Sequence, residues 1–228
     1  MKRYGLPTKS GVSFLKEPPN EALLPPRRRA GQSLAVGRHL LMLRVGVCMK
    51  PFIALFRGIN VGGNNLLPMK DLKKILESLG CSEVTTYIQS GNALFRHPAK
   101  TSADLSREIA MAIEKRCGFR PELLILRPHE LSKIVDANPF SEADLNPSSL
   151  HVTFLASKPE KPELKLLDSI KRDSERFLLR GKAFYLHAPD GIGRSKLAAR
   201  TERALGVAGT SRNMRTISKI MEIAKSYE

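Results

Sequence analysis

The chain has 228 residues, of which 42% are hydrophobic and 26% are charged. This composition is typical of a folded globular protein and excludes a chain that is disordered throughout. Lys and Arg number 38 against 22 Asp and Glu, which gives a net charge of +16 and favours anionic partners such as phosphates or nucleic acids.

The first 48 residues are predicted to lie outside the folded body, as a disordered or non-native extension. They hold nine basic and two acidic side chains, and proline pairs at 18–19 and 25–26 interrupt any apolar period. Such a segment buries too little apolar surface to offset the entropy of ordering. It is interpreted as a translated upstream region, a targeting sequence or a nucleic-acid-binding arm. We favour the first, because Met49 directly precedes a strand pattern.

The sequence predicts neither a membrane-spanning helix nor the disulfides of an oxidising compartment. The apolar run at 40–47 is interrupted by Arg44 and is far shorter than the roughly 20 residues of a spanning helix. Cys48, Cys81 and Cys117 match no metal or disulfide pattern, so we expect reduced thiols, with Cys81 and Cys117 packed in the interior. The predictions are a cytoplasmic protein with no cofactor, no metal and no membrane partner.

Residues 49–140 are predicted to form a first α+β subdomain. The apolar run at 52–56 indicates a buried strand, and Pro68 opens a helix that Gly80 ends. The elements that follow are strands at 84–88, 93–95 and 123–126, a helix at 101–117 ended by Gly118, and a connecting helix at 129–137. The order β-α-β-β-α-β is that of the ferredoxin-like fold, with two helices on one face of an antiparallel sheet.

Residues 141–228 are predicted to form a second subdomain of the same kind, after a linker at 141–149. The pattern predicts a strand at 151–155, a helix at 162–170, strands at 177–179 and 183–186, and helices at 194–205 and 214–224. The order is β-α-β-β-α followed by a helix. We therefore expect an α+β protein of two ferredoxin-like subdomains, packed tightly because each is small for a separate domain.

Two loops of the first half are candidate ligand sites. The segment RGINVGG at 57–63 can present backbone N–H groups to an anion, or it is a turn that needs positive φ. It lacks the Gly-Lys-Ser/Thr ending of a P-loop. In YIQSGN at 87–92, strand alternation places Tyr87 and Gln89 on the same side. The side chains of Gln89, Ser90 and Asn92 hydrogen-bond either a ligand or the neighbouring loop.

Two helix starts in the second half are also candidates. Arg194 and Lys196 follow a glycine-rich turn, and two cations at the positive end of a helix dipole are unfavourable. An anionic ligand relieves this, so 190–196 is the preferred phosphate site; the alternative is a solvated helix start capped by Ser195. Residues 210–216 form another basic helix start with the same two interpretations. The candidate ligand-binding residues are Arg57, Asn60, Gly62, Gly63, Tyr87, Gln89, Ser90, Asn92, Arg194, Ser195, Lys196, Arg212 and Asn213.

The sequence contains no familiar catalytic set. No G-x-S-x-G elbow and no paired carboxylates occur. Four of the five histidines, those after residue 48, lack metal spacing and are predicted to be solvated residues in loops. They are His97, His129, His151 and His187.

Residues 49–228 resemble the bacterial family catalogued as domain of unknown function 1697. The resemblance rests on RGINVGG at 57–63, YIQSGN at 87–92, GIGRSKL at 191–197 and SRN at 211–213. It implies two similar α+β subdomains of ferredoxin-like topology and brings no established activity. Members often carry an aromatic residue after the Arg-Asn pair, where this chain has Met214.

Three functions remain open from the sequence. Four glycine-rich polar loops favour a small phosphorylated or nucleotide-like ligand, above all if they converge where the halves meet. The net charge and the ferredoxin-like sheet favour RNA binding, although the strands lack the aromatic pattern of RNA-binding sheets. An interaction module without catalysis is the third. A pocket lined by the predicted side chains supports the first; its expected members are Arg57, Asn60, Gln89, Asn92 and Arg194.

Overall fold

The computed structural model describes residues 48–98, 101–140 and 146–227. The predicted extension at 1–48, apart from Cys48, lies outside the described residues, and so does the beginning of the predicted linker at 141–149. In chain order the elements are β1 (Lys50–Arg57), α2 (Met69–Ser78), β2 (Ser82–Tyr87), β3 (Asn92–His97), α3 (Ser102–Cys117), β4 (Glu122–Leu126), α4 (Pro128–Asp136), β5 (Leu150–Leu155), α5 (Leu164–Ile170), β6 (Arg176–Arg180), β7 (Ala183–His187), α6 (Lys196–Leu205), β8 (Gly209–Asn213), α7 (Met214–Ala224) and the 3-10 turn η2 (Lys225–Tyr227).

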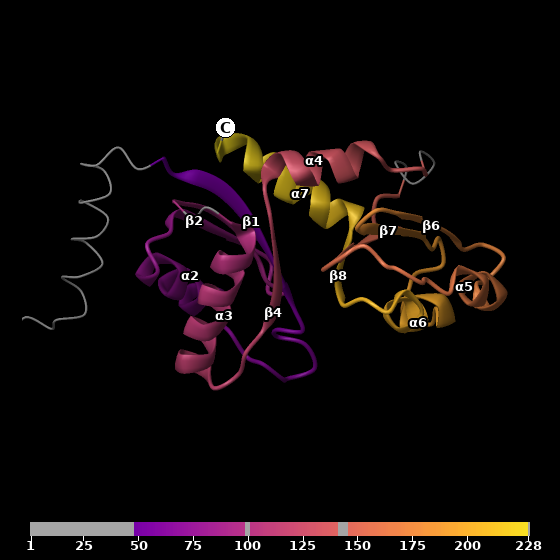
Figure 1. The fold of residues 1–228 in the computed structure, drawn as a ribbon, viewed down its shortest axis with the longest axis horizontal. Helices are drawn as coiled ribbons and strands as arrows, with labels where there is room; N and C mark the ends of the chain where they lie inside the picture. Colours follow the sequence, from indigo (N-terminus) through magenta and orange to yellow (C-terminus); the bar gives the residue numbers. More distant parts are fainter. Residues whose placement is uncertain (1–47, 99–100, 141–145, 228) are drawn as a thin grey trace, which may run out of the picture.

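The described strands form two four-stranded antiparallel sheets, with strand orders β2-β3-β1-β4 and β6-β7-β5-β8. In each half the first strand lies in the middle of the sheet, between the third and fourth strands of that half. Each half therefore follows the order β-α-β-β-α-β (Figure 1). The predicted fold class, α+β with two similar halves, is confirmed.

Two helices of each half cover one face of its sheet, as predicted. Side chains of β1 alternate, so Phe52, Ala54 and Phe56 pack against α2 and α3 in one core. In the second half Phe184 and Leu186 of β7 pack against α5 and α6. The apolar run of β1 is buried on both faces, which explains why it lacks alternation in the sequence.

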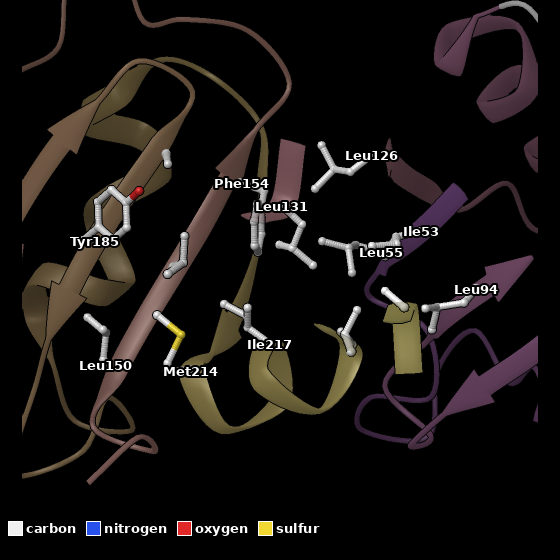
Figure 2. Packing of buried hydrophobic residues seen from close by; sticks show 14 of the residues in the cluster. Ile53, Leu55, Leu94, Leu126, Leu131, Leu150, Phe154, Tyr185, Met214 and Ile217 are labelled. Atoms are coloured by element: carbon white, nitrogen blue, oxygen red, sulfur yellow. The ribbon is translucent and has the colours of Figure 1, made fainter. Parts of the chain in front are cut away.

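The other faces of both sheets share a third core, in which α4 and α7 lie between the sheets (Figure 2). Ile53 and Leu55 of β1 enter this core from the first sheet, and Phe154 and Tyr185 enter it from the second. Leu131 of α4 fills the space between them, together with residues of α7. The members from α7 are Met214, Ile217, Ile220 and Ala224.

Each half also contributes a segment that bonds to the opposite sheet. The Tyr185 hydroxyl of β7 donates to the carbonyl of Ile134 in α4, at 2.7 Å. In return, the hydroxyl of Tyr227, which follows α7, donates to the carbonyl of Leu94 in β3, at 3.2 Å. The two halves are thus interlocked through α4, α7 and their shared core.

Strand β8 corrects the prediction for residues 210–216. These residues were predicted as a helix start, but Gly209–Asn213 pairs with β5 along its length, and the helix begins only at Met214. The strand has the sequence GTSRN, which contains no apolar residue and gives no strand signal. Pairing with β5, distant in sequence, supplies its stability.

Three of the four histidines after residue 48 are not solvated loop residues, so that prediction is wrong for them. His97, His151 and His187 lie in strands β3, β5 and β7; the first and last are buried and His151 is half-buried. Burial lowers the pKa of both His97 and His151. Only His129, in the first turn of α4, is exposed as predicted.

The interior position predicted for Cys81 is confirmed, whereas Cys117 is half-buried. Cys81 is buried in the core under α2 and α3, and Cys117 packs against the same core. Burial raises the pKa of the Cys81 thiol to about 12. This thiol is therefore unreactive at neutral pH.

Candidate functional site

The loop after β1 is held in place by the side chain of Asn60. Its amide nitrogen donates to the carbonyls of Leu67 and Gln89, both at 2.8 Å, and its amide oxygen accepts from the Leu67 N–H at 2.7 Å. Asn60 itself has a φ of 55°, a conformation that Asn tolerates better than most residues. One side chain thus closes its own loop and ties that loop to the β2–β3 turn.

The β2–β3 turn needs glycine at position 91. Gly91 has a φ of 80°, and a Cβ there would lie 2.5 Å from Ile59 and 2.8 Å from Phe56. Asn92, fully buried, closes the turn by donating to the Tyr87 carbonyl at 3.0 Å. The turn therefore packs directly on the end of β1 and on the loop that follows it.

Arg212 of β8 reaches this same place from the second half. Its guanidinium donates to Asn92 Oδ1 at 2.6 Å, to the Phe56 carbonyl at 2.6 Å and to the Gly91 carbonyl at 3.1 Å. Further bonds go to Thr210 Oγ1 and to two more carbonyls. No carboxylate among the described residues pairs with this cation, and burial lowers the pKa of Arg212 to about 10.

We refer to Asn60, Gly91, Asn92 and Arg212 as the Arg212 junction. It joins three of the four segments singled out in the sequence: 57–63, 87–92 and 211–213. These segments converge where the halves meet, as the ligand hypothesis expected, but their buried polar groups bond to one another. The polar side chains of segment 87–92 left exposed or half-exposed are those of Gln89, Ser90 and Tyr87.

The fourth segment lies at the start of α6, and no described hydrogen bond links it to the Arg212 junction. Ser195 caps the helix by accepting from the Ala198 N–H at 2.9 Å. The Arg194 carbonyl accepts from the Arg172 guanidinium at 2.6 Å, while the side chains of Arg194 and Lys196 are exposed. The cap by Ser195 agrees with the alternative interpretation of this segment, a solvated helix start, and phosphate binding here stays a prediction.

The remaining predicted residues have varied surroundings. Asn213 caps α7 through a bond from the Thr216 N–H to its Oδ1, at 2.9 Å. Gly62 and Gly63 are exposed and have φ values of 59° and 79°, as the turn interpretation expects. Met214, which follows the Arg-Asn pair, faces the shared core. Ligand binding by any of these residues stays a prediction.

Arg57 stands apart, because it lies at the mouth of a cleft between the halves. Its guanidinium bonds to Glu122 of β4 and to Glu202 of α6, each at 2.6 Å. Burial acts to lower its pKa, but the bonds and charges of the two carboxylates outweigh this, and the pKa is raised. Arg57 therefore remains a cation that bridges the two halves.

The cleft runs from Arg57 along the free edge of β4, opposite the end of β5 and the β6–β7 turn. Its main groove has a volume of about 560 Å³. A smaller cavity of about 60 Å³ beside Arg57 shares Leu124, Phe154 and Ala156 with it. Polar side chains on the rim of the main groove are Ser102, Ser106, Glu130 and Lys182.

Among the predicted site residues, only Arg57 lines either of these spaces. Sequence reasoning missed the rest of the cleft, because its lining comes from α3, β4, α4, β5 and the β6–β7 turn and carries no shared motif. An apolar strand at 123–126 was visible in the sequence, but nothing marked it as the edge of a sheet.

The sequence model of a family described as "Protein of unknown function (DUF1697)" matches residues 49–185, more than half of the chain. The chain belongs to the DUF1697 family. The matched range includes the first two motif segments and most of the cleft lining, and it ends before the start of α6 and β8. No curated protein matches this chain.

This DUF1697 member is also similar in fold to a conserved bacterial protein from Streptococcus pneumoniae. The two are 20% identical, with a TM-score of 0.59, and the alignment covers 77% of this chain and 99% of the other. At this identity the likeness concerns the fold alone. In the described residues no helix is long and apolar enough to cross a bilayer. No group of three or more potential metal ligands gathers there either.

Proposed function

We propose that this protein binds an organic ligand of low charge in the cleft between its two halves. The observation that carries the proposal is the groove of about 560 Å³ beside β4. Ligand sites in proteins commonly have volumes of about 300–1,000 Å³ and combine an apolar lining with a few polar groups. This groove has that make-up, with Leu124, Ile134 and Phe154 as apolar members and Ser106 and Lys182 as polar ones.

A thermal-shift screen of the full chain against a library of organic compounds tests this function, since a ligand of the folded state raises the melting temperature. Ala156 is exposed and lines both spaces, so Ala156→Trp fills the cleft without replacing a core residue. Ala199→Trp, at an exposed position of α6 outside the cleft, is the matched control. We expect shifts in the wild type and the control that disappear in Ala156→Trp. Shifts that survive in Ala156→Trp contradict the cleft as the site.

A second candidate is a small phosphorylated or nucleotide-like ligand at the start of α6. Arg194 and Lys196 are exposed there, and Arg172 bonds to the Arg194 carbonyl, so three basic residues surround one helix N-terminus. Titration with sugar phosphates and nucleotides should stabilise the wild type at moderate salt but not Arg194→Ala. A shift produced only by RNA, fading as salt rises, favours the nucleic-acid alternative instead.

A further inference from the structure

In the described residues, strand β4 leaves some of its backbone hydrogen-bonding groups without a partner along the cleft. It is an edge strand whose pairing, in the described residues, is with β1. Alternate residues of such a strand turn their N–H and C=O groups away from the partner. Here they are Leu123 and Ile125: Phe56, the register partner of Leu123, donates its N–H to Gly91 on the other side of β1.

A second contact supports this alternation. The Leu123 carbonyl accepts from the hydroxyl of Ser106 in α3, at 3.0 Å, so it points away from β1. The Leu123 N–H and both backbone groups of Ile125 therefore face the groove. Small polar and apolar groups satisfy such a row poorly, whereas an extended backbone matches it in spacing.

The other edge strands of the described sheets are protected in ways that β4 is not. Strand β2 has a register shift between Ser82 and Thr85, and β6 begins and ends with Arg176 and Arg180. Strand β8 has the polar sequence GTSRN. Bulges, charges and polar residues discourage further strand pairing. In contrast, β4 reads ELLIL, with a single charge at its start and no register shift against β1.

We propose that the ligand of the cleft is an extended peptide segment of a partner protein, which adds to β4 as a further antiparallel or parallel strand. This inference rests on the proposed function and specifies the class of its ligand. Side chains of the added strand alternate between two walls. One wall is the α3 wall, formed by Ser102, Ala103 and Ser106, and the other is apolar, with Ile134 and Phe154.

Charge complementarity indicates one feature of the peptide. At the Arg57 end of the cleft, one guanidinium bonds to the two carboxylates of Glu122 and Glu202, so this group of three side chains carries a net negative charge in a chain of net charge +16. A basic residue of the peptide is favoured there. The expected ligand is thus an extended segment with an apolar residue toward Phe154 and a Lys or Arg near Glu122.

Selection from a library of random peptides of about eight residues, which exceeds the typical strand length, provides the probe. The full chain is the bait, and a selected peptide is then synthesised for affinity measurements. Methylating alternate backbone nitrogens of that peptide should weaken binding about tenfold or more, while methylating the intervening nitrogens should change it little. Hydrogen exchange at the Ile125 amide should slow when the peptide is bound.

Variants of the protein complete the test. Leu123→Pro removes one N–H that faces the groove and no bond to β1, and Leu123→Ala controls for the lost side chain. Binding of the selected peptide should fall about tenfold or more in Leu123→Pro and in Ala156→Trp. It should remain near the wild-type value in Ala199→Trp. Leu123 also lines the cleft, so Leu123→Ala gives the baseline against which the further loss in Leu123→Pro is measured.

The outcomes separate this inference from the proposed function. If organic compounds bind in the cleft but the library yields no binding peptide, the peptide inference is overturned and the proposed function stands. Peptides that bind with no alternation in the methylation series, or equally well to Ala156→Trp, overturn strand addition at β4. Self-association that is abolished by Leu123→Pro identifies a second copy as the occupant and also overturns the inference. If neither compounds nor peptides bind, both proposals fail.

Discussion

The Arg212 junction and the cleft beside β4 both lie between the two halves of the protein, but the first is closed by hydrogen bonds and the second is open. At the junction the buried guanidinium of Arg212, in β8, donates to acceptors of β1, β3 and β8 and of the β2–β3 turn, and the loop after β1 is tied to the same turn. At the cleft the halves stand apart, and the Ile125 backbone faces a groove of about 560 Å³. Three of the four sequence motifs meet at the junction, and Arg57 is the one predicted site residue that lines the open space. The motif residues of this chain are therefore, first of all, those that its buried hydrogen bonds require.

The largest expected effect comes from removing the cation at the junction. Arg212→Ala leaves buried carbonyls and the Asn92 amide oxygen without donors, so we expect a loss of about 3–5 kcal/mol in the free energy of unfolding. Arg215→Ala, at the exposed neighbouring position, should stay within about 0.5 kcal/mol of the wild type. Urea unfolding measures both. Equal stability of the two variants contradicts the structural role of Arg212.

A substitution at Gly91, in the crowded β2–β3 turn, should give the next largest loss of stability. Gly91→Ala forces positive φ on an alanine and places its Cβ against Ile59 and Phe56, for an expected loss of about 3 kcal/mol. Gly118, with a φ of 78° and open space around it, isolates the conformational part, so Gly118→Ala should lose only about 1 kcal/mol. Urea midpoints of the two variants give the difference. If both lose the same amount, the contact with the end of β1 is not tight.

Acid should destabilise the protein in a way unrelated to either junction or cleft. Burial lowers the pKa of His97 and His151, so the unfolded chain binds protons more readily than the folded one. Their contribution to stability is complete above the ordinary histidine pKa of about 6.5 and is lost as pH falls below it. The urea midpoint should therefore drop between about pH 7 and pH 5. The drop should be smaller in His151→Gln, and an unchanged slope in that variant excludes His151.

The smallest effect on stability is expected at the mouth of the cleft. Arg57 is 37% exposed, and exposed ion pairs contribute about 1 kcal/mol or less, so Arg57→Gln should barely move the urea midpoint. Its effect should appear in binding instead, as a weaker preference for the basic residue of a selected peptide or an altered response to ligands. A loss of stability comparable to that of Arg212→Ala removes the distinction between the two regions.

Periodicity predicted most of the fold, because most elements carry their own pattern. The helix predicted at 101–117 and ended by Gly118 is α3 at Ser102–Cys117 in the structure, with Thr101 as its N-cap and Gly118 in the left-handed conformation. Strand β8 was missed because its sequence has no apolar residue, and its place depends on backbone pairing with β5. His97 and His187, the last residues of β3 and β7, were missed for a related reason. A polar residue at a strand end gives no strand signal, and its burial depends on which distant residues pack against it.

The sequence by itself determined the α+β class, the doubled plan and the ends of most elements, since hydrophobic spacing, caps and glycines act within a few residues. It also marked the loops that converge near Gly91. Only the tertiary structure decided that Arg212 fills their centre, that α4 and α7 lie between the sheets, and that β4 borders an open groove. Those outcomes depend on contacts between residues far apart in the chain, such as Arg212 with Asn92 and Tyr185 with Ile134. No local pattern encodes which partner a buried donor meets or which strand is left at an edge.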